Sequence, residues 1–182
     1  MDKLLVVVDM QVDFVTGSLG SPEAQKIVPR VVEKVKQALE NKNTVAYTMD
    51  THKENYLETF EGQNLPVEHC IDGTGGWELI PELNGLLHEK HQFKKPTFGS
   101  LALVSEYQNG CFSEVELCGV CTDICVVSNA LLLRAALPET RIVVDSLATA
   151  GSSREAHAAA LLVMQKNQID VIYHEDPKEV AA

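Results

Sequence analysis

The chain has 182 residues, a formal net charge of −11 and five cysteines. A chain of this length typically folds as one domain, so we expect a single domain spanning residues 1–182. The acidic balance argues against a nucleic-acid partner, because phosphate binding requires a basic face. No apolar run reaches about 18 residues, so no membrane span or membrane partner is expected. The odd cysteine count and the lack of a basic leader predict a reducing, cytoplasmic location.

Short runs of β-branched residues alternate with longer stretches of helical periodicity along the chain. The runs predict strands over residues 3–9, 44–49, 88–94, 113–118, 141–145 and 170–173. Helical spacing predicts helices over residues 23–40, 101–108, 122–137 and 154–167. Ser21 and Pro22 are typical of the cap and the first position of a helix. The Gly- and Pro-rich stretch that follows residue 49 and runs to about residue 87 is too long for an ordinary connection, so it is a candidate functional loop.

This alternation defines the predicted fold class. Strands separated by helices imply right-handed crossovers and a parallel sheet that is covered on both faces. The apolar runs VVV and IVV fit strands that are buried on both sides. We therefore expect an α/β fold, a three-layer α/β/α domain with a doubly wound, mainly parallel sheet of about six strands.

The carboxyl ends of the predicted strands carry polar and charged residues. In parallel sheets of this kind, ligands bind in the crevice outside these ends. Asp9, Asp50, Lys95 and Asp145 each follow a predicted strand, and the turn over residues 119–125 follows another. The sequence therefore predicts an active site along this edge of the sheet.

A thiol lies at one of these strand ends, in the segment CGVCTDICVV. With Thr122 or Asp123 as the helix cap, Cys125 lies in or near the first turn. The free backbone N–H groups and the helix dipole there favour an anion, so we expect a lowered thiol pKa and a place for a developing oxyanion. A neighbouring lysine would lower the thiol pKa further, and an aspartate could pass a proton to a leaving amine. Lys95 and Asp9 are the candidates for these roles.

Each of these residues also has an ordinary structural interpretation. A cysteine in an apolar helix is commonly a small buried hydrophobe, and we interpret Cys70 and Cys111 in this way. Lys95 could be a solvated loop charge, Lys94 could take its role, and Asp9 could cap local backbone. Only the convergence of thiol, lysine and aspartate at strand ends favours a nucleophilic site.

The spacing of three cysteines offers a rival interpretation. Cys118, Cys121 and Cys125 form a C-x-x-C-x-x-x-C pattern, which suggests a redox pair or a thiolate metal site. No second C-x-x-C group and no nearby histidine complete such a site, so we disfavour it. An inactive binding or scaffold protein would have lost one of the three reactive residues, and all three are present.

A candidate metal site follows the second predicted strand. Asp50 and His52 lie two residues apart, His69 follows in LPVEHC, and Glu61 lies between them. Two imidazoles with one or two carboxylates suit zinc, iron or manganese. Spacing alone does not favour this site over ordinary polar residues of a surface loop.

The segments VVVDMQVDF, KKPTFGS and GVCTDICV resemble the three signature segments of the isochorismatase-like cysteine hydrolases, which include nicotinamidases and pyrazinamidases. The resemblance covers nearly the whole chain in the same order. It implies that Asp9, Lys95 and Cys125 are catalytic. It also implies a cis peptide bond between Val120 and Cys121, with the backbone N–H groups of Cys121 and Cys125 forming an oxyanion hole.

The resemblance also supports the metal site. It implies that Asp50, His52 and His69 bind a divalent metal, zinc before iron or manganese, and that Glu61 is a further ligand with the weakest support. Open coordination positions would let a pyridine nitrogen or water bind the metal.

Aromatic residues are expected around the substrate ring. Phe14 matches an aromatic that lines the ring pocket of the family, and Phe98 is expected to supply another wall. Trp77 is a further candidate, for which a core anchor of the long loop is the preferred interpretation. We interpret His157, which lies among alanines on a helix face, as structural.

The resemblance implies hydrolysis of nicotinamide to nicotinate and ammonia through a cysteine thioester, a reaction of NAD salvage. The alternative is the same chemistry on another small amide, such as a carbamoyl or ureido compound. Isochorismatases themselves lack the nucleophilic cysteine, so Cys125 argues against that activity. The expected partners are a small-molecule amide and further copies of the chain in a homo-oligomer.

Overall fold

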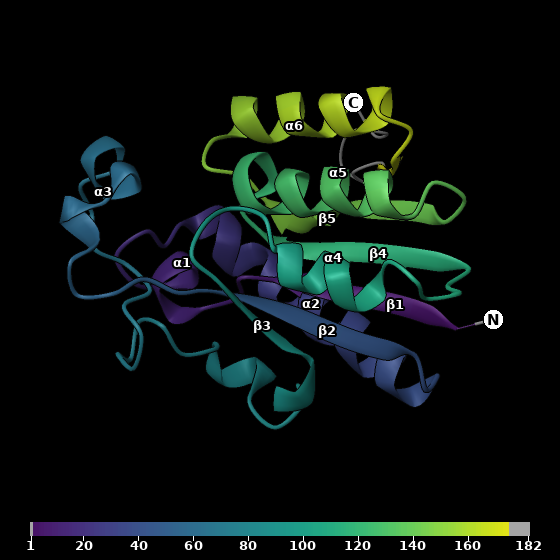
Figure 1. Ribbon diagram of the computed structural model, residues 1–182, viewed down its shortest axis with the longest axis horizontal. Coiled ribbons are helices and arrows are strands. Elements are labelled where there is room, and N and C mark those ends of the chain that lie inside the picture. The colour runs from purple at the N-terminus through teal and green to yellow at the C-terminus, as the bar shows by residue number, and fades with distance from the viewer. Residues whose placement is uncertain (1, 175–182) are drawn as a thin grey trace, which may run out of the picture.

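A computed structural model describes residues 2–174 and contains a six-stranded, all-parallel sheet of order β3-β2-β1-β4-β5-β6 (Figure 1). The predicted α/β class and the parallel sheet are confirmed. The strands are β1 (Lys3–Val8), β2 (Thr44–Asp50), β3 (Gln92–Lys95), β4 (Glu114–Val120), β5 (Arg141–Ala150) and β6 (Asp170–Ile172).

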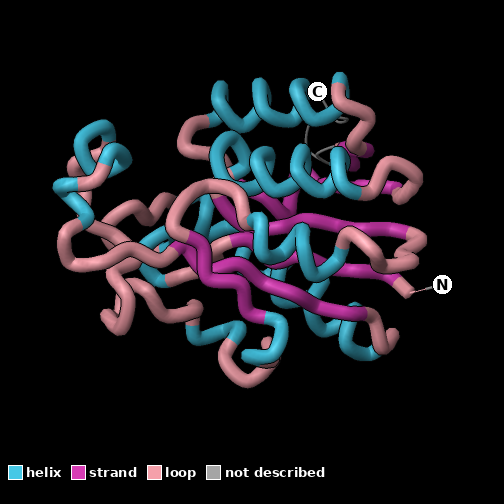
Figure 2. Tube along the Cα trace, viewed as in Figure 1, coloured by secondary structure: helices cyan, strands magenta, loops and turns pink. Residues whose placement is uncertain are grey.

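Helices cover both faces of this sheet, as the alternating pattern predicts (Figures 1 and 2). One face packs against α2 (Pro22–Glu40), and the other packs against α4 (Leu101–Tyr107), α5 (Val127–Ala136) and α6 (Arg154–Lys166). Two short helices, α1 (Val12–Val15) and α3 (Phe60–Asn64), lie in the loops beyond the carboxyl ends of the strands. Within residues 2–174 no helix has both the length and the apolar character needed to cross a membrane.

Two hydrophobic cores lie on the two faces of the sheet, and β1 supplies both of them. Leu5 and Val7 point into the core under α2, whereas Leu4, Val6 and Val8 point into the core under α4, α5 and α6. Successive side chains of a strand alternate between faces, so an unbroken apolar run serves a strand that is buried on both sides.

Helix α2 begins where the sequence predicts. The Ser21 hydroxyl accepts a hydrogen bond from the Ala24 amide at 3.0 Å, and Pro22 fills the first helical position. The cap satisfies one of the amides that a helix start leaves without a partner.

Two predicted element boundaries are wrong. The third strand begins only at Gln92, because Glu89–His91 forms a turn of 3₁₀ helix in place of extended chain. The predicted helix over residues 122–137 opens with a π-helical turn, Thr122–Val126, before α5 begins.

The prediction that Asp145 lies at the active edge is also wrong. A register shift where β5 pairs with β4 between Leu117 and Gly119 lets β5 continue to Ala150, so Asp145 lies inside the strand. Its buried carboxylate accepts hydrogen bonds at 2.8 Å from Arg30 and lies 2.8 Å from the Lys34 ammonium, both on α2. Asp145 therefore ties α2 to the sheet.

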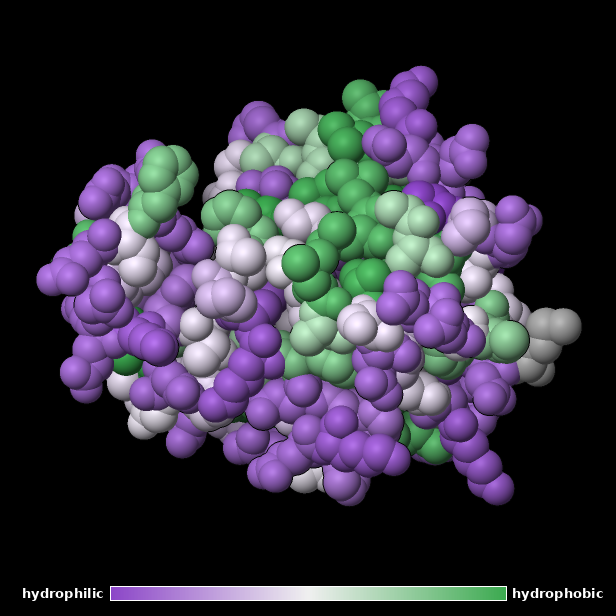
Figure 3. Space-filling view, viewed as in Figure 1, coloured by the Kyte–Doolittle hydropathy of each residue, from purple (hydrophilic) through white to green (hydrophobic). Residues whose placement is uncertain are grey.

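Exposed apolar side chains gather over α4, α5 and α6 (Figure 3), among them Leu101 and Leu162. Contiguous apolar surface of this kind often marks an interaction site. The expected homo-oligomer stays a prediction.

We expect Asp145→Asn to lower the free energy of unfolding by about 1–3 kcal/mol, because it removes a buried carboxylate that pairs with the partly buried Arg30 and Lys34. Burial alone would raise the pKa of Asp145, but the hydrogen bonds from Lys34 and Arg30 outweigh burial and hold that pKa below its usual range. The stabilisation of the fold by the ionised Asp145 carboxylate is therefore complete above the unfolded-state pKa of about 3.9. It disappears as the pH falls through the folded-state pKa of Asp145.

Denaturant unfolding at several pH values measures this difference. The control is Asp170→Asn, which removes an ion pair with Arg141 whose two side chains are more than half exposed, and it should cost at most about 1 kcal/mol. Equal effects of the two substitutions at neutral pH, or a difference that persists under acid, would contradict the role given to Asp145.

Candidate active site

The predicted reactive residues meet at the carboxyl edge of the sheet, around the point where the strand order reverses between β1 and β4. Asp9 follows β1, Asp50 ends β2 and Lys95 ends β3. Cys125 lies in the π-helical turn that follows β4. All four side chains are buried.

The Lys95 ammonium lies at the centre of this group. Its Nζ atom is 2.7 Å from Asp9 Oδ2, and it donates hydrogen bonds to Asp50 Oδ1 at 3.2 Å and to Cys125 Sγ at 3.4 Å. Burial alone would lower the pKa of Lys95, but its acidic neighbours, above all Asp9, outweigh burial and raise it. The lysine is therefore a permanent cation that forms an ion pair with Asp9 and donates hydrogen bonds to Asp50 and Cys125.

Asp9 adopts a left-handed backbone conformation, with φ of 49°. Oδ1 accepts a hydrogen bond from the Thr48 hydroxyl at 2.7 Å, whereas Oδ2 faces Lys95 without an aligned hydrogen-bond donor among the described groups. Burial raises the pKa of Asp9, although Lys95 opposes this effect. A carboxylate with an unsatisfied, buried oxygen and a raised pKa is suited to accept a proton.

Gly119 makes room for this arrangement. It has φ of 112°, and a Cβ atom at this position would lie 2.1 Å from the carbonyl oxygen of Val8. Only glycine lets the end of β4 approach the end of β1 so closely.

The expectation of a lowered thiol pKa at Cys125 is wrong. Burial raises this pKa well above its ordinary value and the charge of Asp9 adds to the effect, while Lys95 opposes it. The thiol therefore keeps its proton in the free protein. Nucleophilic attack then requires that the proton leave at the same time, and Asp9 is the acidic neighbour that can take it.

The turn that carries Cys125 is anchored from α6 and the segment before it. Thr122 and Asp123 do not cap the helix as expected: the Thr122 hydroxyl lies 2.8 Å from His157 Nδ1, and the Asp123 carboxylate accepts hydrogen bonds from the Ser152 amide and hydroxyl at 2.8 and 2.6 Å. His157 is thus structural, as expected. The Val120–Cys121 peptide bond is cis, as the resemblance implies.

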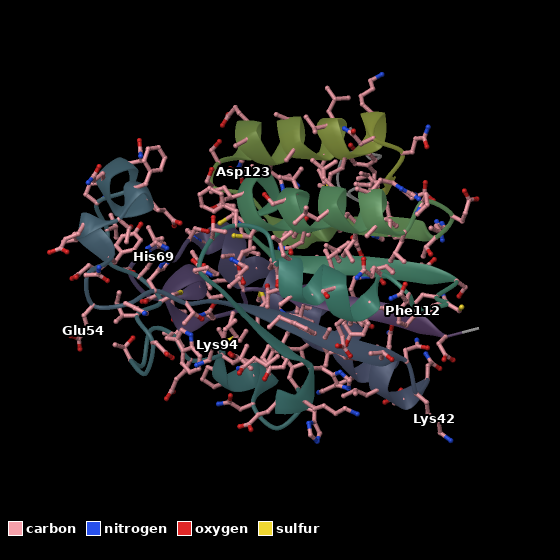
Figure 4. The ribbon with its side chains drawn as sticks, in the orientation of Figure 1. Lys42, Glu54, His69, Lys94, Phe112 and Asp123 are labelled. Atoms are coloured by element: carbon pink, nitrogen blue, oxygen red, sulfur yellow. The ribbon has the colours of Figure 1, made fainter. Side chains whose placement is uncertain are left out.

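A second group of side chains lies beside the thiol, on the other side of Asp50. The candidate ligand atoms of Asp50, His52, Glu61 and His69 all lie within 4.8 Å of one another. Asp50 Oδ2 is 3.0 Å from His52 Nε2 and 3.5 Å from His69 Nε2, and Glu61 Oε1 is 3.6 and 3.8 Å from the same two nitrogens. Figure 4 shows His69 between α3 and the edge of the sheet.

This donor set fits a divalent metal. His69 Nδ1 lies 2.8 Å from the Val67 carbonyl oxygen, so it donates its proton there and leaves Nε2 as the acceptor that faces the other ligands. The ring of Tyr56 packs against both imidazoles, with its centroid 4.7 Å from that of the His52 ring and 4.9 Å from that of the His69 ring. Two oriented imidazoles and two carboxylates at this spacing suit zinc, as well as iron or manganese.

A cavity of about 250 Å³ opens between the thiol and the candidate metal ligands. Phe14 and Phe98 line it together with Cys121, Cys125, Asp50, Glu61 and His69. Their expected contact with a substrate ring stays a prediction. Trp77 is outside this lining and donates a hydrogen bond from Nε1 to the Thr51 hydroxyl at 2.9 Å, in agreement with its interpretation as an anchor of the long loop.

Other residues of the cavity lining were missed by sequence reasoning. They are apolar or small residues of separate segments that only the fold brings together: Leu19, Ser21, Ala24, Leu65, Val120, Ile124, Ala150, Gly151 and Ser152. No charge or spacing signal in the sequence distinguishes them from ordinary core and loop residues.

The cysteines do not support the rival interpretation. All five are free thiols, and Cys118 is buried in the core under α2. Among residues 2–174, the side chains that could jointly hold a metal form one group, which contains no cysteine. Cys70 is buried as expected, whereas Cys111 is exposed, so the prediction of a buried Cys111 is wrong.

Comparisons with known proteins agree with this geometry. Residues 3–176 match the Isochorismatase domain family. The chain is 30% identical over 215 residues to the nicotinamidase of Schizosaccharomyces pombe, which covers 95% of this chain and 94% of that protein. The crystal structure of the pyrazinamidase of Pyrococcus horikoshii in complex with zinc is similar at a TM-score of 0.82 and 27% identity, covering 96% of this chain and 100% of that one.

The nicotinamidase PncA of Bacillus subtilis is similar to the same degree, with a TM-score of 0.82 and 27% identity over 95% of this chain and 100% of that structure. The chain therefore belongs to the isochorismatase family. It is a hydrolase of this family that is related to the nicotinamidases.

We expect Lys95→Ala to lower turnover by at least about 10²-fold, since it removes the cation that contacts both Asp9 and the thiol. Lys94→Ala is the matched control. Lys94 points the other way, onto the Trp77 ring and the Asp72 carboxylate, and its loss should leave turnover nearly unchanged. The measurement is the rate of ammonia release from a small amide substrate, made on variants whose circular dichroism is native. It shows which of the two lysines turnover depends on. A crippling effect of Lys94→Ala would contradict this assignment.

We expect Asp9→Asn to accelerate alkylation of Cys125 at neutral pH while it abolishes turnover. The negative charge of Asp9 raises the thiol pKa, so its removal should lower that pKa and increase the thiolate fraction. Mass mapping after limited iodoacetamide treatment at a series of pH values measures this effect.

The exposed Cys111 in the same samples is the internal control and should react equally in both proteins. Slower alkylation of Cys125 in the Asp9→Asn variant would mean that Asp9 already holds the thiol as a thiolate in the free protein, contrary to the pKa directions above.

Proposed function

We propose that the protein hydrolyses nicotinamide to nicotinate and ammonia, with Cys125 as nucleophile. The observation that carries this proposal is the position of the Lys95 ammonium, which contacts the thiol, Asp9 and Asp50 at once. The ammonium thus links a nucleophile and its proton acceptor to Asp50 of the candidate metal site. Cys125 and the candidate ligands Asp50, Glu61 and His69 line one small cavity. That cavity is smaller than the roughly 300–1,000 Å³ of sites for drug-sized ligands, which suits an amide with a single ring.

In the first half of the reaction, Cys125 Sγ attacks the carboxamide carbon and its proton passes to Asp9. The carbonyl oxygen becomes an oxyanion that the backbone N–H groups of Cys121 and Cys125 are proposed to stabilise. When the C–N bond breaks, Asp9 returns the proton to the nitrogen, so ammonia leaves and a thioester remains on Cys125. Lys95 stays charged throughout and stabilises the negative charge on sulfur and on Asp9.

In the second half, water attacks the thioester carbon and gives a proton to Asp9. The C–S bond breaks, the proton held by Asp9 returns to the sulfur of Cys125, and nicotinic acid leaves and gives up its carboxyl proton to water as nicotinate. Asp9 acts as base and then as acid in each half, which suits a carboxyl group whose pKa is raised by burial.

The substrate is proposed from the second group of side chains. Asp50, His52, His69 and Glu61 would hold a divalent metal, for which zinc is the preferred identity. When bound, the metal would supply a Lewis-acidic partner for a ring nitrogen and so orient the ring. Phe14 and Phe98 would flank the ring. The nicotinamidase and pyrazinamidase relatives, one of them in complex with zinc, support this choice of substrate.

Ammonia release from nicotinamide, benzamide and a ureido compound tests the proposal. Benzamide has the same size and carboxamide but no ring nitrogen, so we expect it to be a much poorer substrate. A strong chelator should abolish nicotinamide hydrolysis, and added zinc, iron or manganese should restore it. His52→Ala should have the effect of the chelator, because it removes a proposed ligand, and Glu61→Ala should have a smaller effect.

Alkylation of Cys125 in the chelated protein serves as the control, since it shows that the thiol remains intact when the metal is removed. A metal-free preparation that hydrolyses nicotinamide and benzamide equally well would refute the orienting role of the metal. Preference for the ureido compound would move the substrate to another class of small amides.

A further inference from the structure

The candidate metal ligands lie on chain segments that are distant in the sequence. Asp50 ends β2 and His52 lies two residues beyond it, whereas His69 lies in the long loop that follows. A site built in this way needs something that fixes the two segments relative to each other. The contacts for this come from residues 11–14, directly after Asp9.

Gln11 holds the Asp50 segment. Its fully buried side chain accepts a hydrogen bond from the Asp50 amide at 2.7 Å and donates one to the Asp50 carbonyl oxygen at 2.9 Å. It also donates to the Trp77 carbonyl oxygen at 2.8 Å, which ties the long loop to the same point. The amide side chain thus pairs with both backbone groups of Asp50.

Asp13 holds the His69 segment. Its Oδ2 atom accepts a hydrogen bond from the Cys70 amide at 2.8 Å. Cys70 has a left-handed backbone with φ of 47°, a conformation that is unfavourable for a residue other than glycine. The Cys70 carbonyl oxygen in turn accepts a hydrogen bond from the His52 amide at 2.9 Å. One carboxylate therefore fixes the turn that joins the two histidine segments.

The surroundings of Asp13 are built around this contact. The Asp13 amide donates to the Gly76 carbonyl oxygen at 2.9 Å, and a Cβ atom at Gly76 would lie 2.2 Å from Asp13 Oδ2. The next residue, Phe14, packs its ring edge-on at 5.4 Å from that of His69. The backbone of the loop at Gly76 thus lies directly against the carboxylate.

We infer that Asp13 is a positioning residue for the metal site, because its carboxylate fixes the Cys70 turn and through it the relative placement of His69 and His52. This inference rests on the proposed metal-binding role of these histidines. Partners that orient metal ligands without touching the metal typically contribute about 10- to 100-fold to metal affinity.

Zinc affinity of the metal-free protein, measured by competition with a chromogenic chelator, tests the inference without reference to activity. We expect Asp13→Ala to weaken zinc binding by about 10- to 100-fold. Asp13→Asn should retain much of the affinity, because its amide oxygen can still accept from the Cys70 amide. Gly76→Ala should also weaken binding, since its methyl group displaces the carboxylate. It provides an independent test if Asp13→Ala does not fold.

Asp72→Ala is the matched control. Asp72 is an aspartate of the same loop whose side chain pairs with Lys94. Its contact with His52 is made by the backbone amide, which the substitution leaves in place, so zinc affinity should not change. Alkylation of Cys125 in the metal-free Asp13 variants should equal that of the wild type, which separates positioning of the metal ligands from general damage to the site.

Wild-type zinc affinity in both Asp13→Ala and Gly76→Ala would overturn the inference. So would equal weakening in Asp13→Ala and Asp13→Asn together with altered Cys125 alkylation, because that pattern indicates general destabilisation. A wild-type protein that binds no zinc would overturn the metal site itself, and the positioning role with it.

Discussion

A buried ammonium group governs the arrangement of the active edge. Lys95 is 1% exposed, and removal of such a cation from water costs several kcal/mol unless opposite charges and hydrogen bonds replace the solvent. Asp9 and Asp50 supply the two negative charges, at 2.7 and 3.2 Å, and the sulfur of Cys125 accepts a hydrogen bond from the ammonium at 3.4 Å. The ends of β1, β2 and β3 therefore have to lie together for the lysine to be stable in this place.

The parallel register meets this requirement. Asp50 and Lys95 are direct partners in the ladder between β2 and β3, and Val8 pairs with Thr48 on one side and with Gly119 on the other. The chain thus leaves β1 at Asp9 in a left-handed conformation beside Thr48, whose hydroxyl fixes one carboxylate oxygen and leaves the other toward Lys95. One carboxylate oxygen of Asp50 contacts Lys95 and the other contacts His52. The proposed metal site and the thiol are therefore linked through Asp50 and Lys95.

Much of the arrangement of the active edge could be predicted from the sequence, because the ends of the strands can be located from the apolar runs. The runs that end before Asp9 and around Asp50 and Lys95 are short and bounded, and topology brings such ends to one edge. The apparent end of the strand at Asp145 misleads, since a register shift against β4 extends β5 and turns this residue toward α2. The prediction of a lowered thiol pKa at Cys125 is wrong for a different reason. The position of the thiol near a helix start can be inferred from the sequence, whereas its burial and the nearby Asp9 charge cannot.

The contacts of Gln11 and Asp13 lie beyond sequence reasoning for the same reason, because each side chain bonds to backbone groups dozens of residues away. The central claim of this account is a thioester on Cys125 during nicotinamide hydrolysis. Rapid acid quenching of the working protein, followed by peptide mass mapping, tests it most directly. We expect a nicotinoyl group on the peptide that contains Cys125, with Cys121 unmodified. Ammonia release without an acylated Cys125, under conditions that trap thioesters, would contradict the account.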